Sequence, residues 1–340
     1  MSDELVIICC YSMAQATTDY SHRSLVQKLG VKPHERVEIV GDVGAGLRRD
    51  VKDVLGRGLV RSGELDGAIV MVQSVEEGEE AFVNLIHHLL ENGSDGLVVA
   101  GTTGEGATLS DDEKARIWAL AVAEAGGAPV IAGTGTYDTA HSVHLTQKAT
   151  EIGVDGVLVV TPYYNKPNRR GLRAHFEAVA AATDKPVVLY NIPGRCVIDL
   201  PNDFLRELGQ AIPNVAAVKQ ARVEDIEAID GMDLLAGNDD TLAEVLDEGG
   251  TGGICVSSHL VARQMRRMID EPDARHEIHA ELKDIFDVMF ITSSPTPVKA
   301  ALNMLGIHVG GLRLPMVEAS EDEEQTIRGV LERHGLLSAV

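Results

Sequence analysis

Short apolar runs alternate with amphipathic stretches along most of the chain, from about residue 94 onward. Each run is rich in small or β-branched residues and is followed by a polar loop and then by a stretch with helical spacing. Strands that are joined by a full crossover pair in parallel, so this pattern predicts a parallel sheet. The seven runs are residues 96–100, 129–132, 156–160, 186–190, 215–218, 233–236 and 252–256.

An eighth run, Gly-Ala-Ile-Val-Met-Val at residues 67–72, precedes the helical stretch 79–91 and is placed to be the first strand. Eight parallel strands with intervening helices are the pattern of a (β/α)8 TIM barrel, which is an α/β fold. The sequence therefore predicts a barrel over residues 67–270. Helical stretches at 261–269, 275–289, 297–305 and 323–334 complete the barrel and continue as a C-terminal helical extension over residues 271–340.

Residues 1–66 exceed what the barrel needs. Apolar runs at 5–10 and 37–40 alternate there with helical stretches at 24–29 and 47–55. This alternation predicts a small N-terminal βαβα unit, and the sequence does not indicate its role.

The charge of the chain excludes two classes of partner. Thirty basic and 52 acidic residues give a formal net charge of −22, which repels nucleic acid and anionic membranes. The apolar run at 5–10 is too short for a membrane span or a signal peptide. The four cysteines form neither a disulfide framework nor a spaced zinc set. We therefore expect a cytoplasmic protein that uses no metal.

Lys219 is the first candidate for chemistry. It closes the run Val-Ala-Ala-Val-Lys, a buried-strand pattern that ends on the one side chain able to form an imine with a ketone. Enzymes with a (β/α)8 barrel keep their catalytic residues at the carboxyl ends of the strands. A strand-end lysine that points into water is the alternative, and the neighbouring loops decide against it.

Three loops at other strand ends also carry polar side chains. The loop Gly-Thr-Thr-Gly-Glu-Gly, residues 101–106, combines backbone N–H groups with the hydroxyls of Thr102 and Thr103, which suits a small carboxylate. Residues 161–167, Thr-Pro-Tyr-Tyr-Asn-Lys-Pro, display paired tyrosines. Residues 189–195, Leu-Tyr-Asn-Ile-Pro-Gly-Arg, place the Tyr190 phenol at a strand end and the Arg195 guanidinium five residues later. Tyr190 could transfer protons, and Arg195 could hold a second carboxylate.

With these motifs in order, the chain resembles the dihydrodipicolinate synthase and N-acetylneuraminate lyase superfamily of class I aldolases. The resemblance covers residues 79–337 and includes the later segments Gly-Asn-Asp-Asp at 237–240 and Pro-Val-Lys at 297–299. It implies that Lys219 forms an imine with pyruvate and that Tyr190 shuttles protons at the imine carbon. Thr102 would link Tyr190 to Tyr164 of a neighbouring subunit, so a homodimer or homotetramer is expected.

The resemblance also implies a binding site for two substrates, pyruvate and a small aldehyde. Thr103 would bind the pyruvate carboxylate, and Arg195 would gather the carboxylate of the aldehyde. Ile254 would lie in the last strand, near the lysine, and Gly237 would complete the substrate-binding residues. Arg195 favours the synthase branch, which condenses pyruvate with L-aspartate 4-semialdehyde to 4-hydroxy-tetrahydrodipicolinate on the way to lysine. No cofactor is implied beyond the covalent imine through Lys219.

Two other functions stay open. A lyase for a 2-keto-3-deoxy sugar acid, or one of the N-acetylneuraminate type, would use the same imine on a longer substrate. The other is a degenerate, non-catalytic barrel, in which the N-terminal unit would carry the function. This alternative stays open because the expected first strand departs from the family's pattern. Family members usually end that strand in Thr-Pro, whereas this chain has Val-Gln-Ser-Val at residues 72–75.

Overall fold

The computed structural model describes residues 5–9, 37–40, 67–71 and 75–337. The chain divides into two compact units, residues 1–82 and 83–340. Helix α3 (Val75–Glu91) begins in the first unit and ends in the second.

A three-stranded parallel sheet is the described part of the first unit. It consists of β1 (Leu5–Cys9), β2 (Val37–Val40) and β3 (Gly67–Met71), in the order β1-β3-β2. Gly67 is in register with Leu5 on one side and with Val37 on the other. Strands thus lie within both apolar runs expected before residue 66, while the βαβα unit as a whole stays a prediction. The expected helices at 24–29 and 47–55 lie outside the described residues.

The expectation that residues 67–72 form the first strand of the barrel is wrong. Residues 67–71 of this run pair with β1 and β2 and form the central strand of their sheet. A run that is apolar on both faces suits any buried central position, so its pattern did not specify which sheet it joins. The domain boundaries expected after residues 66 and 270 stay predictions.

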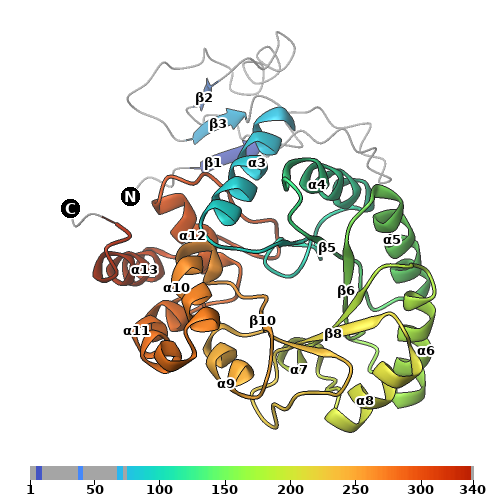
Figure 1. Cartoon of the computed structure of the whole chain (residues 1–340). Helices are drawn as coiled ribbons and strands as arrows, with labels where there is room; N and C mark the ends of the chain where they lie inside the picture. Colours follow the sequence, from blue (N-terminus) through green and yellow to red (C-terminus); the bar gives the residue numbers. More distant parts are fainter. Residues whose placement is uncertain (1–4, 10–36, 41–66, 72–74, 338–340) are drawn as a thin grey trace, which may run out of the picture. The chain divides into compact units, whose positions relative to one another are not determined.

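Seven parallel strands form the sheet of the second unit, which curves inside a ring of helices (Figure 1). The strand order β4-β5-β6-β7-β8-β9-β10 follows the sequence and leaves β4 and β10 at the two edges of the described sheet. All seven runs expected as strands after residue 94 are confirmed. They are β4 (Leu97–Val99), β5 (Val130–Gly133), β6 (Gly156–Val160), β7 (Val187–Asn191), β8 (Val215–Gln220), β9 (Asp233–Ala236) and β10 (Gly252–Gly253).

Helices follow every strand of this sheet except β8 and cover the outside of the curved sheet (Figure 1). Trp118 shows how they pack: its side chain is fully buried, and its indole N–H donates to the carbonyl of Val99 at 3.3 Å. The helices between the strands are α4 (Asp111–Glu124), α5 (Thr139–Ile152), α6 (Arg169–Ala180), α7 (Pro193–Cys196), α8 (Asn202–Ala211), the 3-10 helix η1 (Asp239–Thr241) and α9 (Leu242–Asp247).

Four further α-helices follow β10, at the positions where the sequence predicts them. They are α10 (Ser258–Asp270), α11 (Arg275–Val288), α12 (Thr296–Met304) and α13 (Glu321–Arg333), with the 3-10 helix η2 (Pro272–Ala274) between the first two. Helix α11 packs on α10 and α13, and α13 packs on α12. Within the described part of the chain, every helix is too short or too polar to cross a membrane.

Candidate active site

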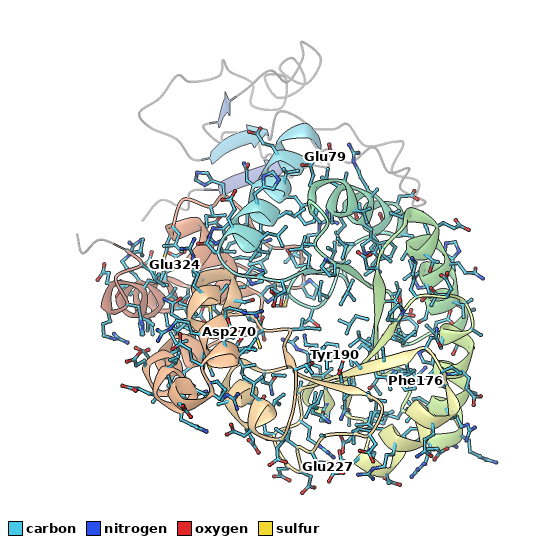
Figure 2. All side chains as sticks on the ribbon, viewed as in Figure 1. Glu79, Phe176, Tyr190, Glu227, Asp270 and Glu324 are labelled. Carbon is cyan, nitrogen blue, oxygen red and sulfur yellow. The ribbon has the colours of Figure 1, made fainter. Side chains whose placement is uncertain are left out.

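Lys219 and Tyr190 lie side by side at the carboxyl ends of neighbouring strands. They are in register across β7 and β8, and both side chains are buried, with 9% and 4% of their surface exposed. The Lys219 Nζ atom lies 4.2 Å from the centroid of the Tyr190 ring. Figure 2 labels Tyr190 toward the middle of the ring of elements. The structure thus brings a buried amine and a buried phenol together where barrel enzymes carry out their chemistry.

A buried amide network holds these two strand ends in place. Asn191 and Gln220 directly follow Tyr190 and Lys219, and the Asn191 side chain donates to Gln220 Oε1 at 2.9 Å. Asn191 also donates to Asp199 Oδ1 at 2.7 Å and accepts from the N–H of Leu200 at 3.1 Å. Because buried polar groups are costly when unpaired, this set of bonds fixes the position of both strand ends.

The loop after β4 carries Thr102 and is tightly turned. The N–H of Glu105 donates to the Thr102 carbonyl at 3.1 Å, and the N–H of Gly106 donates to the Gly101 carbonyl at 3.0 Å. A Cβ atom at Gly106 would lie 2.1 Å from the carbonyl oxygen of Ala100, so only glycine fits there. Gly106 is therefore required by the shape of the loop.

A cavity of about 460 Å³ opens beside Tyr190. Three of the predicted site residues line it, namely Thr102, Tyr190 and Arg195. Lys219 is not among the residues that line this cavity, but its Nζ atom lies over the ring of Tyr190, which does line it. Among the remaining lining residues are Lys114, Tyr163, Cys196, Ser294 and Met316. Thr103, Tyr164, Gly237 and Ile254 are not among the residues that line it.

Arg195 lies in the short helix α7, directly after the end of β7. Its Nη2 group donates to the carbonyl of Ser294 at 3.2 Å, which ties it to the segment before α12. The neighbouring Cys196 thiol is buried, and burial raises its pKa to about 11, against the opposing effect of Arg195. Arg195 is the one basic residue of α7, and it lines the cavity.

The paired tyrosines after β6 point to different places. Tyr163 packs edge-on against Tyr137, with ring centroids 5.5 Å apart, and burial raises the pKa of its phenol. Tyr164 is 92% exposed and has a left-handed backbone with φ of 74°. The structure of the single chain thus leaves Tyr164 in solvent and does not bring it to Thr102 or Tyr190.

The strand ends on the other side of Lys219 hold two more of the predicted residues, Gly237 and Ile254. The N–H of Gly237 donates to the Gln220 carbonyl at 2.7 Å, and a Cβ atom there would lie 2.8 Å from Ala221 Cβ. Strand β10 is shorter than predicted and ends at Gly253. Ile254 continues its direction, because its N–H donates to the Ala236 carbonyl at 2.8 Å.

Asp239, which the sequence analysis left without a role, is fully buried near Lys219. Its Oδ1 atom accepts a hydrogen bond from the N–H of Ser257 at 3.0 Å. Burial raises the pKa of Asp239 to about 6, and the Ser257 N–H and the positive charge of Lys219 oppose that rise. Burial also raises the pKa of the Cys255 thiol, which lies beside this carboxyl group. The position of Asp239 in the 237–240 motif, directly after a strand end, was the signal that could have identified this residue.

Comparisons with known proteins agree with this geometry. The model of the dihydrodipicolinate synthetase family matches residues 71–334. A 4-hydroxy-tetrahydrodipicolinate synthase of Desulforamulus reducens is 44% identical over 266 residues, which are 74% of this chain and 90% of that protein. The protein of the same name from Bacillus subtilis is 43% identical over 261 residues, 73% of this chain and 90% of its own length.

Solved structures give the same result. The crystal structure of the dihydrodipicolinate synthase from Cyanidioschyzon merolae, with lysine bound, is 37% identical in sequence and superposes with a TM-score of 0.74. The match covers 76% of this chain and 92% of that one. The fold of the second unit is therefore the barrel fold of that enzyme.

Proposed function

The chain belongs to the dihydrodipicolinate synthetase family, and we propose that it condenses pyruvate with L-aspartate 4-semialdehyde through an imine on Lys219. The product would be 4-hydroxy-tetrahydrodipicolinate, in agreement with the names of the relatives. One observation carries the proposal: a buried amine in contact with a buried phenol, both at strand ends, in a barrel of this family.

The amine of Lys219 begins the reaction by attacking the ketone carbon of pyruvate, and the carbonyl oxygen leaves as water. The resulting imine withdraws electrons, so the neighbouring methyl group can lose a proton and form an enamine. The enamine carbon then attacks the aldehyde. The amino group of the aspartate semialdehyde finally displaces Lys219 from the imine carbon, which closes the ring of the product and frees the lysine amine. The Tyr190 phenol would supply and remove protons at the imine carbon, a role that the contact of Lys219 Nζ with the Tyr190 ring, 4.2 Å from its centroid, supports.

The pyruvate carboxylate requires a receptor near the imine. The loop 101–106 follows β4 and offers the hydroxyls of Thr102 and Thr103 together with backbone N–H groups, a combination that suits a carboxylate. Thr102 lines the cavity beside Tyr190, which supports its assignment to the proton relay. The assignment of Thr103 to the carboxylate rests on the resemblance.

The second substrate brings a second carboxylate, and Arg195 is the cation assigned to it. Arg195 lines the same cavity as Tyr190, so an aldehyde that reaches the enamine would have its carboxylate within reach of the guanidinium. A neutral sugar tail would gain nothing from this charge. The position of Arg195 therefore favours the synthase reaction over the sugar-acid lyase.

We assign the active form to a dimer or tetramer, because Tyr164 needs a partner to have a function. Its side chain is 92% exposed although it follows a buried strand, and its backbone is left-handed. Projecting into a neighbouring subunit would cover this aromatic ring and complete the relay of Thr102 and Tyr190. The exposed Tyr137, beside Tyr163, would lie on the same surface.

Turnover with purified substrates tests the proposed function. The protein should consume pyruvate in the presence of L-aspartate 4-semialdehyde, measured by coupling the product to a reductase of known stoichiometry. Incubation with N-acetylneuraminate or a 2-keto-3-deoxy sugar acid should release no pyruvate. Release of pyruvate from either acid, with no condensation of the semialdehyde, would replace the synthase by a lyase.

A further inference from the structure

Glu105 connects the carboxylate-binding loop to a distant part of the chain. Its Oε2 atom accepts a hydrogen bond from the ammonium of Lys299 in α12 at 2.7 Å. Both side chains are mostly buried, with 13% and 15% of their surface exposed. A pair this buried is screened less than a surface ion pair, so breaking it leaves an uncompensated charge inside the protein.

The segment after α12 forms hydrogen bonds with both Glu105 and Lys299. The second carboxylate oxygen of Glu105, Oε1, accepts from the backbone N–H of Arg313 at 2.9 Å. The Lys299 ammonium also donates to the carbonyl of Gly311. The Arg313 side chain donates to the Thr108 carbonyl at 3.3 Å and to both carboxylate oxygens of Glu113, at 2.7 and 2.9 Å. Helix α12 and residues 311–313 therefore hold the loop at two points.

The loop needs this support, because its backbone is strained. Ala100 and Glu105 both adopt left-handed conformations, with φ of 59° and 52°, which non-glycine residues adopt only at a cost. Gly133 as well as Gly106 abuts the Ala100 carbonyl, and a Cβ atom at Gly133 would lie 2.3 Å from that oxygen. A conformation of this kind persists only where its surroundings fix it. The bonds to Glu105 supply such fixation on the side of the loop that carries Thr102 and Thr103.

We propose that Glu105 and Lys299 are positioning residues for pyruvate. Their ion pair fixes the loop 101–106 and also neutralises a carboxylate two residues from Thr103. Without the Lys299 ammonium, the Glu105 carboxylate would repel the pyruvate carboxylate and would lose one of its two anchors. This inference rests on the proposed function, in which the loop receives pyruvate.

Lys299→Met tests the inference, because it keeps the length of the side chain and removes the charge. We expect KM for pyruvate to rise by about tenfold or more, while KM for the aldehyde changes less than about threefold, because Arg195 is not on this loop. Lys283→Met is the matched control, since Lys283 pairs with Asp287 on the exposed face of α11. The control should leave both KM values within about twofold of wild type.

The double variant Glu105→Gln/Lys299→Met separates positioning from general loss of stability. Removing the unpaired carboxylate should recover part of the pyruvate affinity lost in Lys299→Met. If Lys299→Met does not fold, the neutral pair Glu105→Gln/Lys299→Gln should still raise KM for pyruvate by at least about threefold and spare the aldehyde. A KM for pyruvate equal to that of the control, or equal losses for both substrates, would overturn the inference.

Trapping with borohydride distinguishes this failure from failure of the proposed function. Wild-type protein should be labelled on Lys219 at increasing pyruvate concentrations, and Lys299→Met should need about tenfold more pyruvate for half-maximal labelling. Equal half-maximal concentrations would refute the role of Lys299 alone. An unlabelled wild type would refute the imine and the inference with it.

Discussion

Asp239→Asn should make the protein more stable at neutral pH and leave it nearly unchanged in acid. Asp239 is fully buried after β9, and burial raises its pKa from 3.8 to about 6. The folded state therefore keeps a proton that the unfolded chain releases between about pH 4 and 6. Stability is lost as the pH rises through this window, and the full loss applies above the folded pKa.

The size of the effect follows from the shift. Raising the pKa of Asp239 from 3.8 to about 6 corresponds to about 3 kcal/mol of folding stability lost at neutral pH, because each pKa unit is worth about 1.36 kcal/mol. Asparagine cannot ionise, and its amide oxygen can still accept the hydrogen bond that Oδ1 receives from Ser257. We therefore expect Asp239→Asn to gain up to about 3 kcal/mol over wild type at pH 7.5 and little at pH 4.

Urea unfolding followed by circular dichroism at both pH values measures this difference. Asp240→Asn is the matched control, because Asp240 is exposed beside Asp239 and its carboxylate stays hydrated in both states. A gain in stability of Asp239→Asn that is the same at pH 4 and pH 7.5 would refute the reasoning. So would a variant that is less stable than wild type at pH 7.5.

Two further predictions concern substrate recognition and assembly. Arg195→Ala should still form the pyruvate imine, but kcat/KM for the aldehyde should fall by the equivalent of about 1.5 to 3 kcal/mol, the range for a charge-assisted hydrogen bond. Turnover of aspartate semialdehyde at the wild-type rate would count against the synthase. Tyr164→Phe and Lys219→Ala proteins, each nearly inactive alone, should regain part of their activity when mixed, since some mixed dimers then hold one intact site. Strictly additive activity after proven subunit exchange, or an active monomer in sedimentation, would rule out a shared site.

The strands of the second unit were predictable because buried parallel strands are nearly continuous apolar runs. The same property explains the error at residues 67–72, since an apolar run shows that a strand is buried but not which strand it pairs with. Strand β10 was predicted too long, because residues 254–256 remain apolar after the pairing with β9 has ended. Periodicity thus gives the elements more reliably than their partners.

In the candidate site, too, local sequence patterns revealed single residues but not the contacts between distant ones. Lys219 and Tyr190 were identified because each closes an apolar run of the sequence, and parallel strands bring such ends to one edge. The contact of Glu105 with Lys299 joins residues 194 positions apart, so no local pattern could reveal it. Asp239 belongs to the motif at residues 237–240, but its burial depends on the packing of residues around Ser257. The roles assigned to all eight predicted site residues stay predictions, as does the cytoplasmic location.

The central claim is that Lys219 forms an imine with pyruvate. Reduction with borohydride in the presence of pyruvate, followed by mass spectrometry of the peptides, tests it directly, and Lys219→Ala serves as the control. We predict one pyruvate-derived adduct, confined to the peptide that contains Lys219 and absent from the variant. An adduct on another lysine would contradict the assignment of the residue, and no adduct at all would favour a barrel that binds ligands without catalysis.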